Sequence, residues 1–348
     1  MAEREPTDLF LALTPERVLA AVEAGGLRST GLCYPLNSFE NRVYEVELID
    51  RTRVVAKFYR PGRWSEQQVL EEHAFLRELA AEEIPVAPAR EFPGGGTLRR
   101  EGHILYALFD RRGGRAPDEL DAALAQRLGR LTARLHNVAV RGEARHRLAL
   151  TGDEYARADL DWLQAADRVP APLERRYFDA AHALADLYDR LASGVPTHRL
   201  HGDLHLGNLL MRGEVLWLVD FDDMMVGPAV QDLWLAVGGR DRESLALREE
   251  LLAGYEELRA FDRSTLRLIE ALRGLRMVHY AAWLARRFHD PIFPRTWPHF
   301  GTEDYWRRET EGLEEQLEVA RIEADPGAAR DEETPLTNKD YFWDWEKE

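Results

Sequence analysis

The sequence contains almost no cysteine. Cys33 is the single one among 348 residues, so no disulfide can form within the chain and a reducing compartment is expected. One isolated thiol is more typical of a small buried side chain than of a catalytic nucleophile. Stability must therefore come from an ordinary hydrophobic core, for which a hydrophobic content of 45% is sufficient.

Long apolar runs and a surplus of positive charge are also missing. No apolar stretch approaches the ~20 residues of a membrane span, and the start of the chain, MAEREPTDLF, lacks the apolar segment of a signal peptide. Lys and Arg number 46 against 62 Asp and Glu, which gives a net charge of −16. Such a surface repels nucleic acid and anionic lipid, so we expect neither partner and a cytoplasmic location.

The pattern of elements changes near residue 110. Before it lie β-rich segments, which predict strands at 42–49, 53–59 and 103–109, and a helical pattern that begins at Ser65, where Gln68 completes a capping box. After it the patterns are mainly helical, at 118–138, 153–167, 172–193, 228–237, 242–259, 263–289 and 303–323. This division predicts an α+β fold with a small β-rich part and a larger helical part.

A polar loop, LHGDLHLGN at 200–208, interrupts the helical half. Asp203 and Asn208 are five positions apart, and Asp220 follows Asn208 after twelve positions, at the end of an apolar strand. Phosphoryl transfer from ATP uses one carboxylate to accept the hydroxyl proton, and an amide and a second carboxylate to hold Mg²⁺. Protein kinases show the same Asp-to-Asn spacing, followed later by Asp-Phe. The spacing therefore predicts a kinase-type site.

A lysine upstream fits the same chemistry. Lys57 lies within the apolar strand VVAKFY, where an ammonium is poorly placed unless it meets an anion. The following helix offers Glu71 and Glu72, of which Glu72 is the better candidate for the lysine partner that kinases use beside the phosphates. Alone, each residue has a plainer role, such as an edge-strand lysine or a solvated glutamate. Their order along the chain favours the kinase hypothesis.

The residues of the loop, taken alone, also allow a metal site or a structural turn. His201, Asp203 and His205 alternate and could begin a zinc site, although the sequence offers no obvious further ligands. His201 is equally typical of a residue that braces the loop backbone. The loop could also be a plain turn, or part of a nucleotide-binding protein without activity.

Several stretches together resemble a known family. HGDLHLGN, LVDFDD and GRLTARLH are similar to the aminoglycoside phosphotransferase/choline kinase family of protein-kinase-like enzymes. PLNSFENRVYEVE, VVAKFYRPGRW and GPAVQDLWL are similar, more narrowly, to bacterial Ser/Thr protein kinases of the stress response. The resemblance runs from about residue 10 to 325. It implies a bilobal protein-kinase-like fold with an N-lobe at 1–110, a helical C-lobe at 111–325 and an acidic tail at 326–348.

The resemblance also implies ATP, Mg²⁺ and Ser/Thr residues of protein substrates as partners, and nothing in the patterning demands a dimer. The site residues that it implies are of four kinds: catalytic Asp203 and Asp220, ATP-binding Ser38, Lys57 and Glu72, the Mg²⁺ ligands Asn208 and Asp220, and the supporting residues His201 and Asp232.

The chain departs from protein kinases in two ways. NSFENR stands where a glycine-rich loop would cover the phosphates, and only twelve positions separate Asp220 from Asp232, which leaves no room for a long activation loop. The short segment favours a small hydroxyl substrate, whereas the resemblance favours protein. The basic residues Lys57, Arg60, Arg63, Arg111 and Arg112 are candidates for binding acidic protein substrates, or solvated surface residues.

Overall fold

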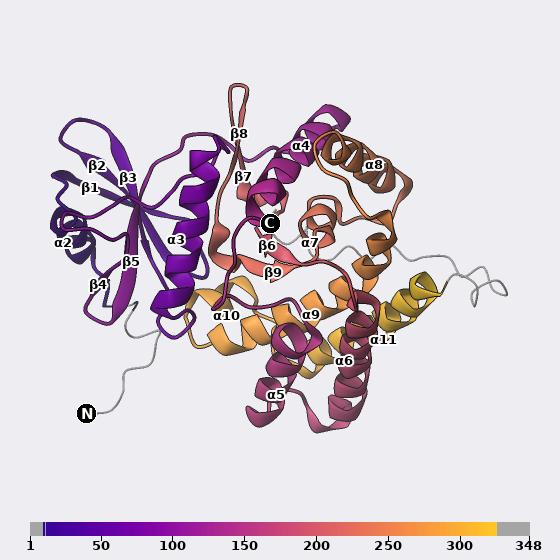
Figure 1. The fold of residues 1–348 in the computed structure, drawn as a ribbon. Helices are drawn as coiled ribbons and strands as arrows, with labels where there is room; N and C mark the ends of the chain where they lie inside the picture. The colour runs from indigo at the N-terminus through magenta and orange to yellow at the C-terminus, as the bar shows by residue number, and fades with distance from the viewer. Residues whose placement is uncertain (1–9, 11, 326–348) are drawn as a thin grey trace. The chain divides into compact units, whose positions relative to one another are not determined.

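The computed structural model describes Phe10 and residues 12–325, so the predicted tail at 326–348 lies outside the described residues (Figure 1). The chain divides into two compact units. Unit 1 is drawn from Met1–Pro117, Ala144–Arg147 and Gly207–Asp222, and unit 2 from Asp118–Glu143, Leu148–Leu206 and Asp223–Glu348. These units interleave along the sequence and differ from the contiguous ranges 1–110 and 111–325, which stay a prediction about domains.

Unit 1 is built on an antiparallel sheet in the order β1-β2-β3-β5-β4. Its strands are β1 (Ser29–Leu36), β2 (Arg42–Leu48), β3 (Arg53–Phe58), β4 (Arg99–Glu101) and β5 (Ile104–Asp110). The predicted strands at 42–49, 53–59 and 103–109 are confirmed as β2, β3 and β5. Strand β1 was not predicted, because STGLCYPL contains glycine and proline and is mostly exposed, without alternation.

Helices α2 (Pro15–Ala24) and α3 (Glu66–Ala81) lie on opposite sides of this sheet in Figure 1. The capping box of α3 is confirmed, with Ser65 and Gln68 each accepting a hydrogen bond from the other's backbone N–H. Val54 and Phe58 of β3 join the buried cluster that includes α2. Since side chains alternate along a strand, Lys57 points to the opposite side, toward α3.

Unit 1 also contains a hairpin from late in the chain. Strands β7 (Leu209–Arg212) and β8 (Val215–Leu218) pair with each other. The Leu218 N–H donates to the carbonyl of Pro85 at 2.9 Å, which joins the hairpin to the segment after α3. Asn208 and Asp220 flank the open end of this hairpin, so both belong to unit 1.

Unit 2 is mostly helical, and its strands β6 (His198–Leu200) and β9 (Met225–Gly227) pair. Its helices are α4 (Ala122–Ala139), α5 (Ala158–Ala165), α6 (Ala171–Ala192), α7 (Val230–Trp234), α8 (Arg242–Glu256), α9 (Ile269–Arg287), α10 (Ile292–Thr296) and α11 (Glu303–Ala324). Helices α4 and α8 cross closely at Gly129 and Gly254, where any Cβ would stand 2.0 Å from a carbonyl oxygen of the other helix.

The predicted α+β fold, with a small β-rich part and a larger helical part, is confirmed. Within the described residues, no helix has both the length and the apolar character needed to cross a bilayer.

Candidate active site

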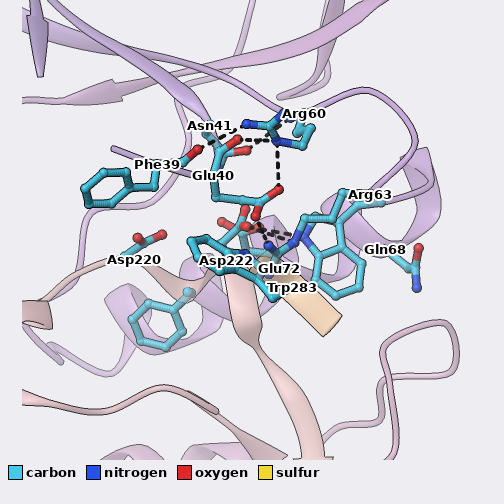
Figure 2. A network of polar contacts seen from close by, with 12 residues as sticks. Phe39, Glu40, Asn41, Arg60, Arg63, Gln68, Glu72, Asp220, Asp222 and Trp283 are labelled. Atoms are coloured by element: carbon cyan, nitrogen blue, oxygen red, sulfur yellow. Dashed lines mark hydrogen bonds and ion pairs between the residues drawn. The ribbon is translucent and has the colours of Figure 1, made fainter. Parts of the chain in front are cut away.

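A buried ammonium surrounded by carboxylates is the central feature of unit 1. Lys57 Nζ lies 3.0 Å from Asp222 Oδ1, 3.4 Å from Asp220 Oδ1 and 3.6 Å from Glu72 Oε1. We call these four residues the lysine cluster; Figure 2 shows its three carboxylates. Burial acts to lower the pKa of Lys57, but the three carboxylates outweigh it and hold the pKa well above its usual value. Lys57 is therefore a permanently charged cation facing the Asp220 segment.

Of the two candidate glutamates, Glu72 is the one that faces Lys57. Its side chain is buried and also receives the Arg147 guanidinium at 3.1 Å. Glu71 instead accepts hydrogen bonds from the backbone N–H groups of residues 145–147, at 2.7–3.1 Å. Neighbouring glutamates on α3 thus do different things: one meets the lysine and the other holds a loop.

Asp222 is a member of the cluster that the sequence did not single out. Burial acts to raise the pKa of Asp222, but Lys57, Arg63 and Arg147 hold it below its ordinary value, so the carboxylate is charged. Arg147 also donates to the carbonyl of Asp222 at 3.0 Å and lies over the Trp64 ring. The segment after Asp220 is therefore fixed through both its backbone and its side chains.

Asp220 and Asn208 offer oxygen atoms at the open end of the β7–β8 hairpin. The Val219 N–H donates to the Asn208 carbonyl at 3.0 Å, which brings the two chain ends together. Asp220 has a φ of +60°, a left-handed conformation that Asp tolerates better than most residues and that costs energy. Its side chain is 56% exposed. Carboxylate and amide oxygens suit Mg²⁺, and the exposure of Asp220 leaves its carboxylate accessible to water and phosphate oxygens.

Other metal arrangements find no support in the geometry. In the part of the chain that the structure describes, no group of three or more His, Cys, Asp or Glu side chains is placed to hold a metal ion. The zinc interpretation of His201, Asp203 and His205 requires such a group.

Residues 37–41 form the Ser38 turn between β1 and β2. The Asn41 N–H donates to Ser38 Oγ at 3.3 Å, and Asn41 Oδ1 accepts from the Arg60 N–H at 3.1 Å. Arg60 also donates to the carbonyls of Phe39 and Glu40, at 3.1 and 3.0 Å. The expectation that Arg60 and Arg63 are solvated, or free to meet a protein substrate, is wrong: both are largely buried and pair with Glu40.

In unit 2, a fully buried carboxylate holds the backbone of the loop at 201–205. Asp232, in α7, accepts hydrogen bonds from the N–H groups of His201 and Gly202, both at 2.8 Å, and lies 3.1 Å from His136 Nε2. Gly202 has a φ of +88°, and a Cβ there would stand 2.1 Å from the Asp223 carbonyl oxygen. Only glycine fits this position. His201 is also fully buried, and its ring Nδ1 accepts a hydrogen bond from the Asp203 N–H at 3.4 Å.

The Asp203 side chain, in the loop at 201–205, lies between two basic groups. Its Oδ1 lies 2.8 Å from the Arg276 guanidinium of α9, and its Oδ2 lies 3.3 Å from His205 Nε2. Burial acts to raise the pKa of Asp203, but Arg276 and His205 outweigh it and hold the pKa well below its usual range. Asp203 is therefore ionised at neutral pH and able to accept a hydrogen bond from a hydroxyl.

The structure thus assembles six of the eight predicted site residues in two groups, while Ser38 and Asn208 belong to unit 1 outside these contacts. Lys57, Glu72 and Asp220 lie together in unit 1, and His201, Asp203 and Asp232 lie together in unit 2. Three charged contacts of these groups were missed: Asp222, Arg147 and Arg276. Arg276 lies 73 positions beyond Asp203, and a helical arginine carries no local signal of such a partner.

Sequence comparison places the chain in a family of phosphotransferases. A family model described as the phosphotransferase enzyme family matches residues 34–269, a range that includes both groups of residues. The chain belongs to this family. Stress response kinase A of Escherichia coli K12 is 37% identical over 318 residues, covering 89% of this chain and 94% of that protein. Serine/threonine protein kinase RdoA of Salmonella typhimurium is 38% identical over 312 residues, with the same coverage of both chains.

Solved structures show the same fold. Amicoumacin kinase hAmiN, in complex with AMP-PNP, Ca²⁺ and Ami, superposes with a TM-score of 0.72 at 18% identity, covering 89% of this chain and 96% of that chain. A microcompartment-associated aminopropanol kinase superposes with a TM-score of 0.65 at 21% identity, covering 87% of this chain and 96% of that chain. The predicted kinase-like fold and the predicted phosphotransferase class are therefore confirmed.

Proposed function

We propose that this phosphotransferase moves the γ-phosphoryl group of ATP, with Mg²⁺, to Ser and Thr hydroxyls of proteins. The observation that carries the proposal is the lysine cluster, in which a buried ammonium lies 3.4 Å from the half-exposed carboxylate of Asp220. Such a cation and such a carboxylate match the two demands of ATP phosphates, which are charge neutralisation and a metal. The protein acceptor is supported by the name of the Salmonella typhimurium relative, serine/threonine protein kinase RdoA.

In this proposal unit 1 holds the nucleotide. Lys57 would bind phosphate oxygens, with Glu72 keeping its ammonium in place, and Ser38 would contribute at the turn between β1 and β2. Asn208 and Asp220 would hold Mg²⁺, which when bound neutralises charge on the phosphates. Asp220, with a φ of +60°, presents its half-exposed carboxylate at the end of the β7–β8 hairpin. The contact of Asp222 with Lys57 holds the segment that follows.

Unit 2 would supply the proton acceptor. Asp203 is ionised because Arg276 and His205 stabilise its charge, so it can orient a substrate hydroxyl and take its proton. A carboxylate of low pKa is a weak base, so orientation is expected to matter more than proton removal. His201 and Asp232 would keep the loop in one conformation, because both contact its backbone.

A small-molecule acceptor is the second candidate. Only twelve positions separate Asp220 from Asp232, and α7 already begins at Val230. The solved structures described above are kinases named for small molecules, amicoumacin and aminopropanol. Their identity to this chain is below 25%, so they support the fold and leave the acceptor to experiment.

The acceptor can be identified directly. Purified protein is incubated with γ-labelled ATP and Mg²⁺, first with a mixture of denatured proteins and then with a panel of amino sugars, choline and aminoalcohols. Label on phosphoserine or phosphothreonine, identified by mass spectrometry, supports the protein-kinase proposal. Label on an alcohol of the panel alone would replace it with the small-molecule alternative.

A further inference from the structure

The Ser38 turn is tied to the lysine cluster by a chain of charged side chains. Glu40, within the turn, pairs with both Arg60 and Arg63. Arg63 Nε also lies 3.5 Å from Asp222 Oδ2, and Trp64 Nε1 donates to the same oxygen at 3.3 Å. The other Asp222 oxygen meets Lys57 at 3.0 Å. Figure 2 shows Arg63 between Glu40 of the turn and Asp222.

Three features make this chain of contacts more than surface pairing. The side chains of Glu40, Arg63 and Asp222 are only 13%, 11% and 4% exposed, so solvent screens them little. All three belong to unit 1, although 182 positions separate the two carboxylates in the sequence. A guanidinium can donate in two directions from one rigid plane, which suits it to bridging two carboxylates.

The Ser38 turn has a particular need for such a tie. A glycine-rich loop approaches phosphates with bare backbone, whereas residues 37–41 all carry side chains and contain no glycine. Such a turn needs other contacts to fix its position relative to Lys57 if its polar groups are to bind the phosphates of a nucleotide. Arg60 binds two carbonyls of the turn. Arg63 links Glu40 of the turn to Asp222, which in turn contacts Lys57.

We propose that Glu40, Arg63 and Asp222 form a positioning relay that sets the Ser38 turn relative to Lys57, and so determines affinity for the nucleotide phosphates. The three residues act through the turn and the lysine and do not themselves contact the nucleotide. The inference rests on the proposed function only in taking Mg·ATP as the ligand of unit 1. It is independent of the acceptor.

The test measures binding of Mg²⁺ with a non-hydrolysable ATP analogue, together with steady-state kinetics, for Glu40→Gln, Arg63→Met and the double variant. Each single variant is expected to raise the dissociation constant and the KM for ATP about tenfold, with kcat changed less than twofold. The double variant should be no worse than either single one, because each break interrupts the same relay. The missing tenfold effect in the double variant corresponds to a coupling free energy between Glu40 and Arg63 of about 1.4 kcal/mol. Arg63→Lys, which keeps the charge, should recover part of the affinity.

Arg17→Met is the matched control, because Arg17 pairs with Glu101 at 2.9 Å in the same unit but outside the relay. It should leave nucleotide affinity unchanged. Two results would overturn this inference and leave the proposed function standing. In one, the relay variants have a lower melting temperature but bind the analogue as well as the wild type does. In the other, the effects of the two substitutions on affinity add in the double variant. Failure of the wild type to bind Mg²⁺ and the analogue would overturn the inference and the nucleotide proposal together.

Discussion

Replacing Asp232 with alanine removes a carboxylate on which the loop at 201–205 depends. Both Asp232 oxygens accept hydrogen bonds from loop N–H groups, those of His201 and Gly202, at 2.8 Å. His136 lies 3.1 Å from one of these oxygens and is itself buried. No solvent reaches Asp232, so water cannot take over the lost acceptors unless the loop moves.

The magnitude follows from the groups left behind. A buried donor that loses its acceptor costs about 1–3 kcal/mol, so two backbone N–H groups together cost about 4 kcal/mol. Asp232→Asn keeps the shape but turns an NH₂ group toward one of the N–H donors, and should lose about half as much. We also expect kcat for phosphoryl transfer to fall more than tenfold in Asp232→Ala, because the backbone of the two residues before Asp203 is no longer fixed.

The assay is urea-induced unfolding, followed by circular dichroism, with Asp241→Ala as the control. Asp241 also accepts two backbone N–H groups, at 3.0 and 2.9 Å, but at the exposed N-terminus of α8, where water can replace it. That substitution should cost about 1 kcal/mol. If Asp232→Ala proves no more destabilising than Asp241→Ala, burial of the unpaired donors is not the source of the cost and the reasoning is refuted.

Two further predictions concern a buried histidine and a glycine. Burial and nearby cations lower the pKa of His73 to about 3, against 6.5 when exposed, so its contribution to stability is complete above pH 6.5 and lost as the pH falls toward 3. The loss is about 1.4 kcal/mol per pH unit, and His73→Gln should flatten the acid dependence of the unfolding midpoint by about one proton; an unchanged slope would contradict this. Gly202→Ala should abolish a folded loop, because its Cβ would stand 2.1 Å from a carbonyl oxygen, whereas Gly213→Ala, with open space around it, should cost only about 1 kcal/mol in thermal unfolding. Equal effects of the two substitutions would refute the steric argument.

The parts of the structure governed by local rules were predictable from the sequence. The capping box at Ser65 predicted the start of α3, and β-rich composition predicted β2 and β3. Both kinds of signal depend on neighbours within a few residues. The five-position spacing of Asp203 and Asn208 is also a local signal, and the catalytic roles that it indicates stay a prediction.

Contacts between distant segments were not predictable in the same way. Asp222 looks like a turn former in DFDD, and only the folding of the late hairpin onto unit 1 brings it to Lys57, 165 positions away. Glu72 was the preferred partner of Lys57, and it is the glutamate that lies 3.6 Å from the ammonium. The second role, in which Glu71 binds the N–H groups of residues 145–147, involves a segment 74 positions away and was not predicted. Arg60 and Arg63 look like surface charges in the sequence, because nothing local reveals that Glu40 pairs with both.

The central claim is that Asp203 and Asp220 divide the work of phosphoryl transfer, and two substitutions test it most directly. Transfer from γ-labelled ATP and binding of Mg²⁺ with a non-hydrolysable analogue are measured for Asp203→Asn and Asp220→Ala beside the wild type. We predict that Asp203→Asn binds the nucleotide normally but transfers no label, since only the orientation of the substrate hydroxyl and the acceptance of its proton are lost. Asp220→Ala should lose nucleotide binding itself. Normal transfer by Asp203→Asn, or unchanged Mg²⁺-dependent binding by Asp220→Ala, would contradict the account.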